Sequence, residues 1–489
     1  MDHRAHISVF TRRIAVVFGV AVIAHAALAQ EPLIFWEGVI DCNAADQGAL
    51  RPRIAVNADG DPVVLWGDNS PMSNHVAVGD GMSFSAPVEV SAGFMPAIAD
   101  WMGSSIASSG NTVWVVMKAA PEESMPVYVR RSDDGGFTWG DTIRVDPFDG
   151  KVSRFPSIDV VDPDGPLVQY MQFDSGYFGA RQIMTRMMGD AFTTPVQVSE
   201  PFAPGDVCDC CPNQVVADPD HVVALYRNAG SNVRVMWGAS SSDGGASFPT
   251  GAVIDTTGWI LPACPSSGPD GYLDGDSVRY VWMSGANSGS KVYLGSASAA
   301  DLTLGDQYSV HGGQPSSLQQ NFPRIAGSGD TLGVVWQQTM SGQSEILFSW
   351  STTGVQGLSA PDTVNVDLSG AQKTADIAYS NGAFHIIWSE TGLGQVRYRK
   401  ALIATTVGIL PVTGADERVF PWPNPAHVTI NIPLYYLTAD VRDAEGRLVM
   451  RNAPLSGGLL DLSSLPTGPY TLELTAADKS RAVGRFVKQ

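Results

Sequence analysis

Short stretches of alternating apolar and polar residues run through most of the chain, separated by turns rich in Gly, Pro, Asp and Ser. Such alternation predicts half-buried β-strands, and Gly and Pro mark the turns between them. One unit recurs, in which a proline and a short apolar strand are followed, roughly 14 residues on, by a strand holding an aromatic residue. The units start at Pro52, Pro96, Pro156, Pro212, Pro265 and Pro323, and a seventh at 374–378 lacks the proline.

The spacing of these units indicates the fold class. Successive units start roughly 44 to 60 residues apart, which is the range of a four-stranded propeller blade. The last unit supplies only three strands, and the strand-like segment 33–40 has no partner of its own. Pairing the two would close the ring and remove both open edges. We therefore predict an all-β chain with a seven-bladed β-propeller over residues 30–402, and six blades as the alternative.

Two turns within the repeats share the pattern S-x-D-x-G-x-[ST]-[WF]. In such a turn the Ser and Asp oxygens accept loop N–H groups, glycine takes a positive φ, and the aromatic residue packs beside the blade. The pattern resembles the Asp-box, or BNR, repeat of the sialidase-like β-propeller superfamily, which implies a structural role. Its residues are Ser132, Asp134, Gly136 and Trp139 in one copy and Ser241, Asp243, Gly245 and Phe248 in the other.

Residues 1–29 have the pattern of a secretory signal peptide. Three arginines precede the apolar run 14–24, and a small-residue site ends at Ala29, where we expect cleavage. The run is too short to span a bilayer comfortably, and no later run reaches the necessary length, so we expect no membrane span in the mature chain. Export also permits disulfides.

The segment 420–489, after an expected linker at 403–419, alternates short strands with turns, which predicts a small Ig-like β-sandwich. It is also similar to the type A C-terminal sorting domain of substrates of the type IX secretion system; an ordinary accessory domain is the alternative. The resemblance implies the outer-membrane secretion machinery as partner, passage through periplasm and outer membrane, and a secreted or cell-surface location. Its motif residues are Pro423, Asn424, Pro425, Gly446, Gly468 and Tyr470.

Charge changes this picture in two ways. The chain has 30 Lys and Arg against 49 Asp and Glu, a formal charge of -19, which repels phosphate backbones and argues against nucleic-acid partners. Basic residues nevertheless recur beside the repeated prolines, which a propeller would gather at one mouth of its channel. The alternative is that these side chains bond carbonyls of adjacent blades. The predicted binding residues are Arg51, Arg53, Arg324 and Lys373.

The resemblance to sialidases implies three arginines that clamp a carboxylate, a tyrosine nucleophile activated by glutamate, and an aspartic acid. The expected Arg-Ile-Pro signature is replaced by a repeated Pro-Arg-Ile-Ala, and no glutamate occurs between Glu200 and Glu345, where the activating one is expected. We therefore assign no catalytic residue. The candidates that remain are Arg53, Arg227, Arg324, Tyr226 and Tyr379.

Four of the five cysteines gather in two segments, at Cys208, Cys210, Cys211 and Cys264. Because an exported chain meets oxidising conditions, we expect two disulfides among them that join adjacent blades. A soft-metal site, copper first, or a redox site is the alternative. Calcium in the acidic turns 59–61 and 270–276 competes with ordinary turn chemistry, and we assign no cofactor.

These observations favour an extracellular propeller that recognises a carbohydrate or surface polymer. The first alternative is a glycoside hydrolase of sialidase type, or another glycan-cleaving enzyme, and the second is a structural adhesion module. A carboxylate pair or a Tyr–Glu pair at the channel mouth would favour an enzyme. Aromatic residues and arginines without such a pair would favour a binding protein.

Overall fold

The computed structural model describes residues 33–404 except 200–205, 313, 341 and 369, and then 417–418, 424–432, 436–444, 446–476 and 481–489. The expected signal peptide with Ala29, most of the expected linker, and Pro423 lie outside the described residues. No helix in the described part has the length and apolar character of a membrane span.

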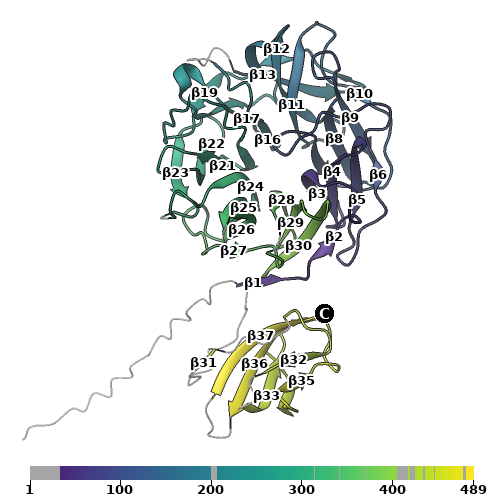
Figure 1. Ribbon diagram of the computed structural model, residues 1–489, viewed down its shortest axis with the longest axis vertical. Coiled ribbons are helices and arrows are strands. Elements are labelled where there is room, and N and C mark those ends of the chain that lie inside the picture. The colour runs from purple at the N-terminus through teal and green to yellow at the C-terminus, as the bar shows by residue number, and fades with distance from the viewer. Residues whose placement is uncertain are drawn as a thin grey trace, which may run out of the picture.

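Residues 33–404 form seven antiparallel sheets, here called blades 1 to 7, around a common centre (Figure 1). Blade 1 holds β3 (Leu50–Val56), β4 (Pro62–Asn69), β5 (Met72–Val78) and β6 (Val88–Glu89). Blade 2 holds β7 (Ser105–Ser109), β8 (Thr112–Lys118), β9 (Val127–Ser132) and β10 (Ile143–Arg144). Blade 3 holds β11 (Val152–Asp159), β12 (Leu167–Asp174), β13 (Phe178–Met188), β14 (Ala191–Phe192) and β15 (Val196–Gln197).

The remaining blades follow in chain order. Blade 4 holds β16 (Gln214–Ala217), β17 (Val222–Arg227), the 3-10 turn η1 (Gly230–Asn232), β18 (Met236–Ser241) and β19 (Thr250–Val253). Blade 5 holds β20 (Asp270–Asp274), β21 (Ser277–Ser284), β22 (Lys291–Ser298) and β23 (Leu304–Ser309). Blade 6 holds β24 (Gln320–Ser328), β25 (Thr331–Met340), β26 (Gln343–Ser351) and β27 (Asp362–Thr363). Blade 7 holds β28 (Gln372–Ser380), β29 (Ala383–Glu390), β30 (Gln395–Ala404), β1 (Leu33–Trp36) and β2 (Ile40–Asp41).

The first strand of each blade, from β3 to β28, contacts the first strand of the next, and β28 contacts β3. β1 pairs with β30, Leu33 opposite Ala404 and Trp36 opposite Ala401, so the start of the described chain completes the last blade. This is the pairing expected for the segment 33–40, and the all-β propeller fold is confirmed. β30 continues to Ala404, two residues beyond the boundary expected at 402.

The core lies between the blades, where the second strands are apolar on both faces. Residues Val63–Trp66 of β4 are all at most 1% exposed. The second strand of every later blade likewise holds a large buried side chain: Trp114, Tyr170, Tyr226, Trp282, Trp336 and Trp388. Each side chain of this size contributes several kcal/mol by leaving water, which explains why the aromatic residue recurs in every repeat.

Two expected repeat starts lie in the wrong segment, and a third, Pro212, is one residue out of register because Gln214 pairs with Leu225. The inner strand of blade 2 begins at Ser105, whereas Pro96 makes only an isolated bridge to Ala119. In blade 5, Asp270 pairs with Val281 as Arg53 pairs with Leu65 in blade 1, so Pro269 and not Pro265 occupies the repeated position. Proline content misled the alignment because the pairing to the second strand, and not the proline, sets the register.

The two Asp-box turns close the third strands of blades 2 and 4. Ser241 Oγ donates to Asp243 Oδ1 at 2.7 Å and accepts the Gly245 N–H at 3.0 Å, and Ser132 makes the same contacts to Asp134 and Gly136. Gly245 has a φ of 83°, and a Cβ there would press on Leu167 of the preceding blade. Trp139 and Phe248 pack into clusters shared with the preceding blade, so the boxes hold neighbouring blades together.

The C-terminal described residues form two further sheets. The larger contains β31 (Glu417–Arg418), β37 (Arg481–Lys488), β36 (Gly468–Ala476), β33 (Tyr436–Arg442) and β34 (Leu448–Pro454), and the smaller β32 (Thr429–Asn431) and β35 (Leu459–Asp461). They share an apolar core that includes Leu460, Leu472 and Phe486. Asn424 Oδ1 accepts the Val487 N–H at 2.9 Å, and Tyr470 donates to the Pro466 carbonyl at 2.7 Å. The part that this segment plays in export stays a prediction.

Candidate binding site at the channel mouth

Four inner strands break their pairing register at one equivalent point, close to the mouth of the channel. The shifts lie just before Arg53, Ser157, Arg324 and Asp376 in β3, β11, β24 and β28. Each shift contains a non-glycine residue with positive φ, which costs about 1–2 kcal/mol and needs surrounding structure to hold it. Bulges of this kind redirect side chains and are common beside functional sites. The residues with positive φ are Arg51 (43°), Phe155 (49°), Phe322 (48°) and Thr374 (46°).

A small cavity of about 30 Å³ lies at this mouth, with room for one or two water molecules. Its lining comes from six of the seven blades and includes Arg51, Arg53 and Arg324 together with two aromatic side chains, Trp101 and Phe322. The three arginines expected from sequence to gather at a channel mouth therefore lie side by side. Lys373 pairs with the lining residue Asp100 at 3.3 Å, with both side chains partly exposed.

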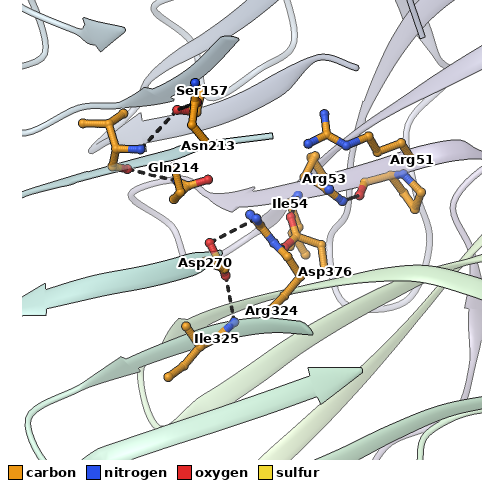
Figure 2. Close-up of polar contacts among 12 residues, drawn as sticks. Arg51, Arg53, Ile54, Ser157, Asn213, Gln214, Asp270, Arg324, Ile325 and Asp376 are labelled. Carbon is orange, nitrogen blue, oxygen red and sulfur yellow. Dashed lines mark hydrogen bonds and ion pairs between the residues drawn. The ribbon is translucent and has the colours of Figure 1, made fainter. Parts of the chain in front are cut away.

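Arg324 lies between two buried carboxylates (Figure 2). Its Nη1 is 3.0 Å from Asp270 Oδ1 and its Nε 2.7 Å from Asp376 Oδ1. The second oxygen of each carboxylate accepts a backbone N–H of the next inner strand, from Ile325 at 2.8 Å and from Ile54 at 3.0 Å. The arrangement therefore joins blades 5, 6, 7 and 1 at the mouth.

Arg51 and Arg53 have a different environment from Arg324. Arg51 donates to the Gly103 carbonyl at 2.6 Å and Arg53 to the Pro52 carbonyl at 2.7 Å. Within the described part of the chain, neither guanidinium forms an ion pair with a carboxylate. Burial and the repulsion of Arg53 and Arg324 lower the pKa of Arg51, and burial with the repulsion of Arg324 lowers the pKa of Arg53 to about 10. The more distant carboxylates of Asp376 and Asp270 oppose both shifts without reversing them. With the Lys373–Asp100 pair included, the mouth thus holds four cationic side chains, Arg51, Arg53, Arg324 and Lys373, against three carboxylates, Asp100, Asp270 and Asp376.

The surroundings of Asp270 shift its pKa. Burial raises the pKa of Asp270 to about 6, the attraction of Arg324 opposes that rise, and the repulsion of Asp376 adds to it. Since Asp270 gains a proton below this value, the mouth becomes more positive on acidification.

The other catalytic candidates do not lie at the mouth. Arg227 is buried and donates to the carbonyls of Ser267 and Met283, at 3.2 and 2.7 Å, between blades 4 and 5. Tyr226 is buried in the core, and Tyr379 packs on Phe384. Of the three candidate arginines, Arg227 therefore does not lie with Arg53 and Arg324, because an arginine at the end of a second strand points between blades. Arg51 takes its place, and no Tyr or Glu is among the described residues that line the cavity.

Sequence reasoning missed the two acids and the two aromatic residues of the mouth. Asp376 stands directly at the repeated position held by Arg53 and Arg324, as its pairing with Ile387 shows. An alignment of the repeats on their second strands would have found it. Trp101 precedes an inner strand that begins later than expected, so no repeat pattern marks it.

Four of the five cysteines lie beside the same mouth, in the segments that carry the lining residues Pro212 and Ser266. Cys210 and Cys264 form a disulfide that joins the loops leading into blades 4 and 5. Cys208 and Cys211 are free, buried thiols with their sulfurs 3.2 Å apart. Of the two expected disulfides, one is therefore present and does join adjacent blades, whereas the other pair is unbonded in the structure.

The acidic turn at 270–276 is occupied by ion pairs. Asp270 binds Arg324, and Asp274 lies 3.0 Å from Arg279, so two of its carboxylates already have cationic partners. In the other turn, Asn57 Oδ1 accepts the N–H groups of Asp59 and Asp61. Ordinary turn chemistry accounts for both segments.

No family model matches the chain, and no curated protein matches it. Several solved structures are similar to the chain. A polysaccharide lyase described as an ulvan lyase, bound to a GlcA–Rha3S unit, is 9% identical with a TM-score of 0.50, over 75% of this chain and 96% of that one. An α-L-arabinofuranosidase of Fusarium graminearum is 14% identical (TM-score 0.41, 66% and 97% covered), and a Hadza microbial sialidase 10% (TM-score 0.41, 71% and 73% covered). The likeness to the ulvan lyase agrees with the β-propeller fold of this chain. At these identities the likeness establishes the fold alone.

Proposed function

We propose that the chain is a glycan-binding propeller whose channel mouth takes the anionic group of an acidic sugar residue, with the sugar ring outside the small cavity. The observation that carries this proposal is the pair Arg51, half-buried, and Arg53, buried, whose guanidinium hydrogen bonds go to carbonyls and not to carboxylates. A buried charge without a counter-charge costs several kcal/mol. A carboxylate or sulfate of a sugar would supply that counter-charge through charge-assisted, bidentate hydrogen bonds.

The aromatic side chains of the mouth suit a sugar ring. Trp101 is half-buried and packs on Phe155 with ring centroids 5.4 Å apart, and Phe322 lines the cavity from another blade. Sites for small ligands combine such apolar surfaces with a few fixed polar groups, which here are the arginines. Because the chain as a whole carries a charge of -19, the mouth is a local positive exception and favours approach of an acidic ligand there.

A glycan-cleaving enzyme is the second candidate, favoured by the carboxylates of Asp270 and Asp376. They converge on one arginine, and Asp270 has a pKa near that of a general acid. Binding is the better-supported function because all four carboxylate oxygens already accept hydrogen bonds or ion pairs within the protein. An acid or nucleophile needs an oxygen directed at the substrate.

The place of action belongs to the same proposal. A cleaved signal peptide and a C-terminal sorting segment would deliver the propeller to the cell surface or medium, where acidic polysaccharides occur. Fractionation of the producing cells tests this, and retention of the full-length chain in the cytoplasm would contradict it.

Titration calorimetry on residues 30–489 tests the binding proposal. The probes are the glucuronate and rhamnose-3-sulfate polymer, polygalacturonate, and neutral arabinan. We expect salt-sensitive binding of the acidic polymers and a loss of roughly 10-fold or more in Arg51→Gln, since a hydrogen bond to a charged group contributes about 1.5–3 kcal/mol. The matched control is Arg131→Gln, which removes an arginine from an exposed Asp-box turn.

Three outcomes would reject the proposal. Equal affinity for arabinan would show that charge is not recognised, and unchanged affinity in Arg51→Gln would move the site elsewhere. Shortening of the polymer by the wild-type chain, lost in Asp270→Asn, would establish the enzyme instead.

A further inference from the structure

Four sulfur atoms lie together beside the mouth, in two different oxidation states. The sulfurs of Cys208, Cys210 and Cys211 all lie within 4.8 Å of one another, and Cys210 is bonded to Cys264. Cys208 Sγ is 3.7 Å from Cys210 Sγ and 3.2 Å from Cys211 Sγ. A thiol pair therefore stands in contact with a disulfide, which is the starting geometry for thiol–disulfide exchange.

The four sulfurs differ in their exposure. Cys208 and Cys211 are buried at 0% and 1% exposure, whereas Cys264 is exposed and Cys210 is half-buried. Reagents in solution can therefore reach the disulfide at Cys264, while the thiols stay behind it. The Ser266 hydroxyl lies 3.2 Å from Cys264 Sγ, where it can donate a hydrogen bond to a departing thiolate.

The surroundings of Cys208 favour its thiolate. Arg234 Nη1 lies 3.4 Å from Cys208 Sγ. The hydrogen bond between Cys208 and Cys211, with the nearby charges of Arg234 and Arg227, lowers the pKa of the Cys208 thiol, although burial opposes this. Burial and the neighbouring Cys208 raise the pKa of Cys211, so Cys208 is the nucleophile and Cys211 remains protonated.

We propose that these four cysteines form an internal thiol–disulfide exchange site with two disulfide isomers. In the first step Cys208 Sγ attacks Cys210 Sγ, a Cys208–Cys210 bond forms, and the electron pair of the broken bond leaves on Cys264. In the second step Cys211 Sγ attacks Cys208 Sγ, and the pair leaves on Cys210. The protons of Cys208 and Cys211 end on Cys264 and Cys210.

The sum of the two steps is redox-neutral. The Cys210–Cys264 disulfide between blades is exchanged for a Cys208–Cys211 disulfide within one loop, and two thiols appear beside the mouth. This isomer unlinks the segments that carry the lining residues Asn213 and Ser266. The exposed Cys264 thiol is then available for a mixed disulfide with a small extracellular thiol–disulfide couple such as glutathione.

Disulfide mapping across graded glutathione buffers tests the proposal on residues 30–489. Free thiols receive one alkylating tag after acid quenching, the remaining cysteines receive a second tag after reduction, and fragmentation locates both. Among molecules with one disulfide in this group, we expect two populations. In one, the first tag marks free Cys208 and Cys211; in the other, it marks free Cys210 and Cys264. The two populations should interconvert after a step in buffer.

Substitutions separate the two steps. In Cys208→Ser we expect tagging of Cys264 to slow by at least tenfold, since the attacking thiol is gone. In Cys211→Ser exchange should stop after the first step, with Cys264 tagged and Cys210 protected. The matched control is Cys42→Ser, which removes a buried thiol of blade 7 and should behave as wild type.

Several results would overturn the proposal. One is that every molecule with one disulfide in this group contains the Cys210–Cys264 bond, at every ratio of reduced to oxidised glutathione. Another is Cys264 tagging in Cys208→Ser at the wild-type rate. A purified chain with all four thiols free around a bound metal would establish a metal site instead. If either variant fails to fold, the wild-type patterns alone decide.

Discussion

Replacement of Arg324 by glutamine removes the cation between two buried carboxylates. The side chains of Asp270 and Asp376 are each 5% exposed, and Arg324 is 16% exposed. Glutamine keeps hydrogen-bonding capacity but cannot offset two negative charges. The two acids cannot turn to solvent without giving up the N–H groups of Ile325 and Ile54 that they accept.

The expected loss of stability follows from the burial of these groups. Removal of one partner from a buried ion pair costs about 3–5 kcal/mol, because the remaining charge stays desolvated. We expect a loss at the lower end, about 3 kcal/mol at pH 8, since part of the Arg324 side chain is in contact with solvent. Further substitution of Asp270 by asparagine should return a part of this loss, because it removes one uncompensated charge.

The loss should depend on pH in a defined direction. The folded-state pKa of Asp270 lies above its ordinary value, so its contribution to stability is present at low pH and is lost as pH rises through about 6. Without the attraction of Arg324 that pKa rises further. Asp270 is then neutral at pH 5 in the variant, and the difference from wild type should be smaller there than at pH 8.

Urea unfolding followed by tryptophan fluorescence at pH 5 and pH 8 measures both effects, because the buried tryptophans lie in the blades. Arg131→Gln is the matched control, since the Arg131 side chain is 31% exposed and its partners Asp133 and Asp164 are themselves exposed to solvent. A loss below about 1 kcal/mol at pH 8, or an equal loss at both pH values, would refute the reasoning from buried charge.

Three further predictions concern the scaffold. Ser241→Ala should cost about 1–2 kcal/mol of stability, since it removes the buried hydroxyl that holds the Asp-box turn, whereas the exposed neighbour Ser242→Ala should cost little; chemical denaturation compares them. Burial lowers the pKa of His385 to about 4, so the fold should lose up to about 3 kcal/mol as pH falls from 6.5 towards 4, and a His385→Gln variant with an unchanged pH profile would contradict this. Gly268→Ala should lower the melting temperature by several degrees because its Cβ would meet a backbone carbonyl of blade 4, while Gly392→Ala, which has open space, should not; equal melting temperatures would show that the loop shifts freely.

The fold could be predicted from sequence because local and global signals agree. Each repeat contains its own strand pattern and a large aromatic residue, and the Asp-box adds a turn whose polar contacts are local. The ring closure followed from the count of strands in the last repeat. The start of blade 2 was predicted wrongly, because the loop 96–104 carries a proline and an apolar pattern but does not pair as an inner strand.

The site could be predicted only in part. Arg51, Arg53 and Arg324 were found because they flank repeated prolines, and the backbone bulges bring them to one cavity. The sequence did not show which acidic residues pair with Arg324, since Asp270 and Asp376 belong to the two neighbouring blades and are far from it in the chain. Disulfide connectivity was equally hidden, because four cysteines allow several pairings and only the packing of blades 4 and 5 selects one.

The closure of blade 7 has a consequence for how the chain acquires its structure. Arg399 donates to the Glu37 carbonyl, a contact between residues 362 positions apart, so the outermost strand of the ring waits for a partner that is synthesised almost last. Until then β1 has an unpaired edge, and truncation of either β1 or β30 leaves the other strand permanently without this partner. Fusions or cuts are best tolerated in the outer turns, and a shortened amino-terminal strand should favour aggregation over a stable six-sheet intermediate.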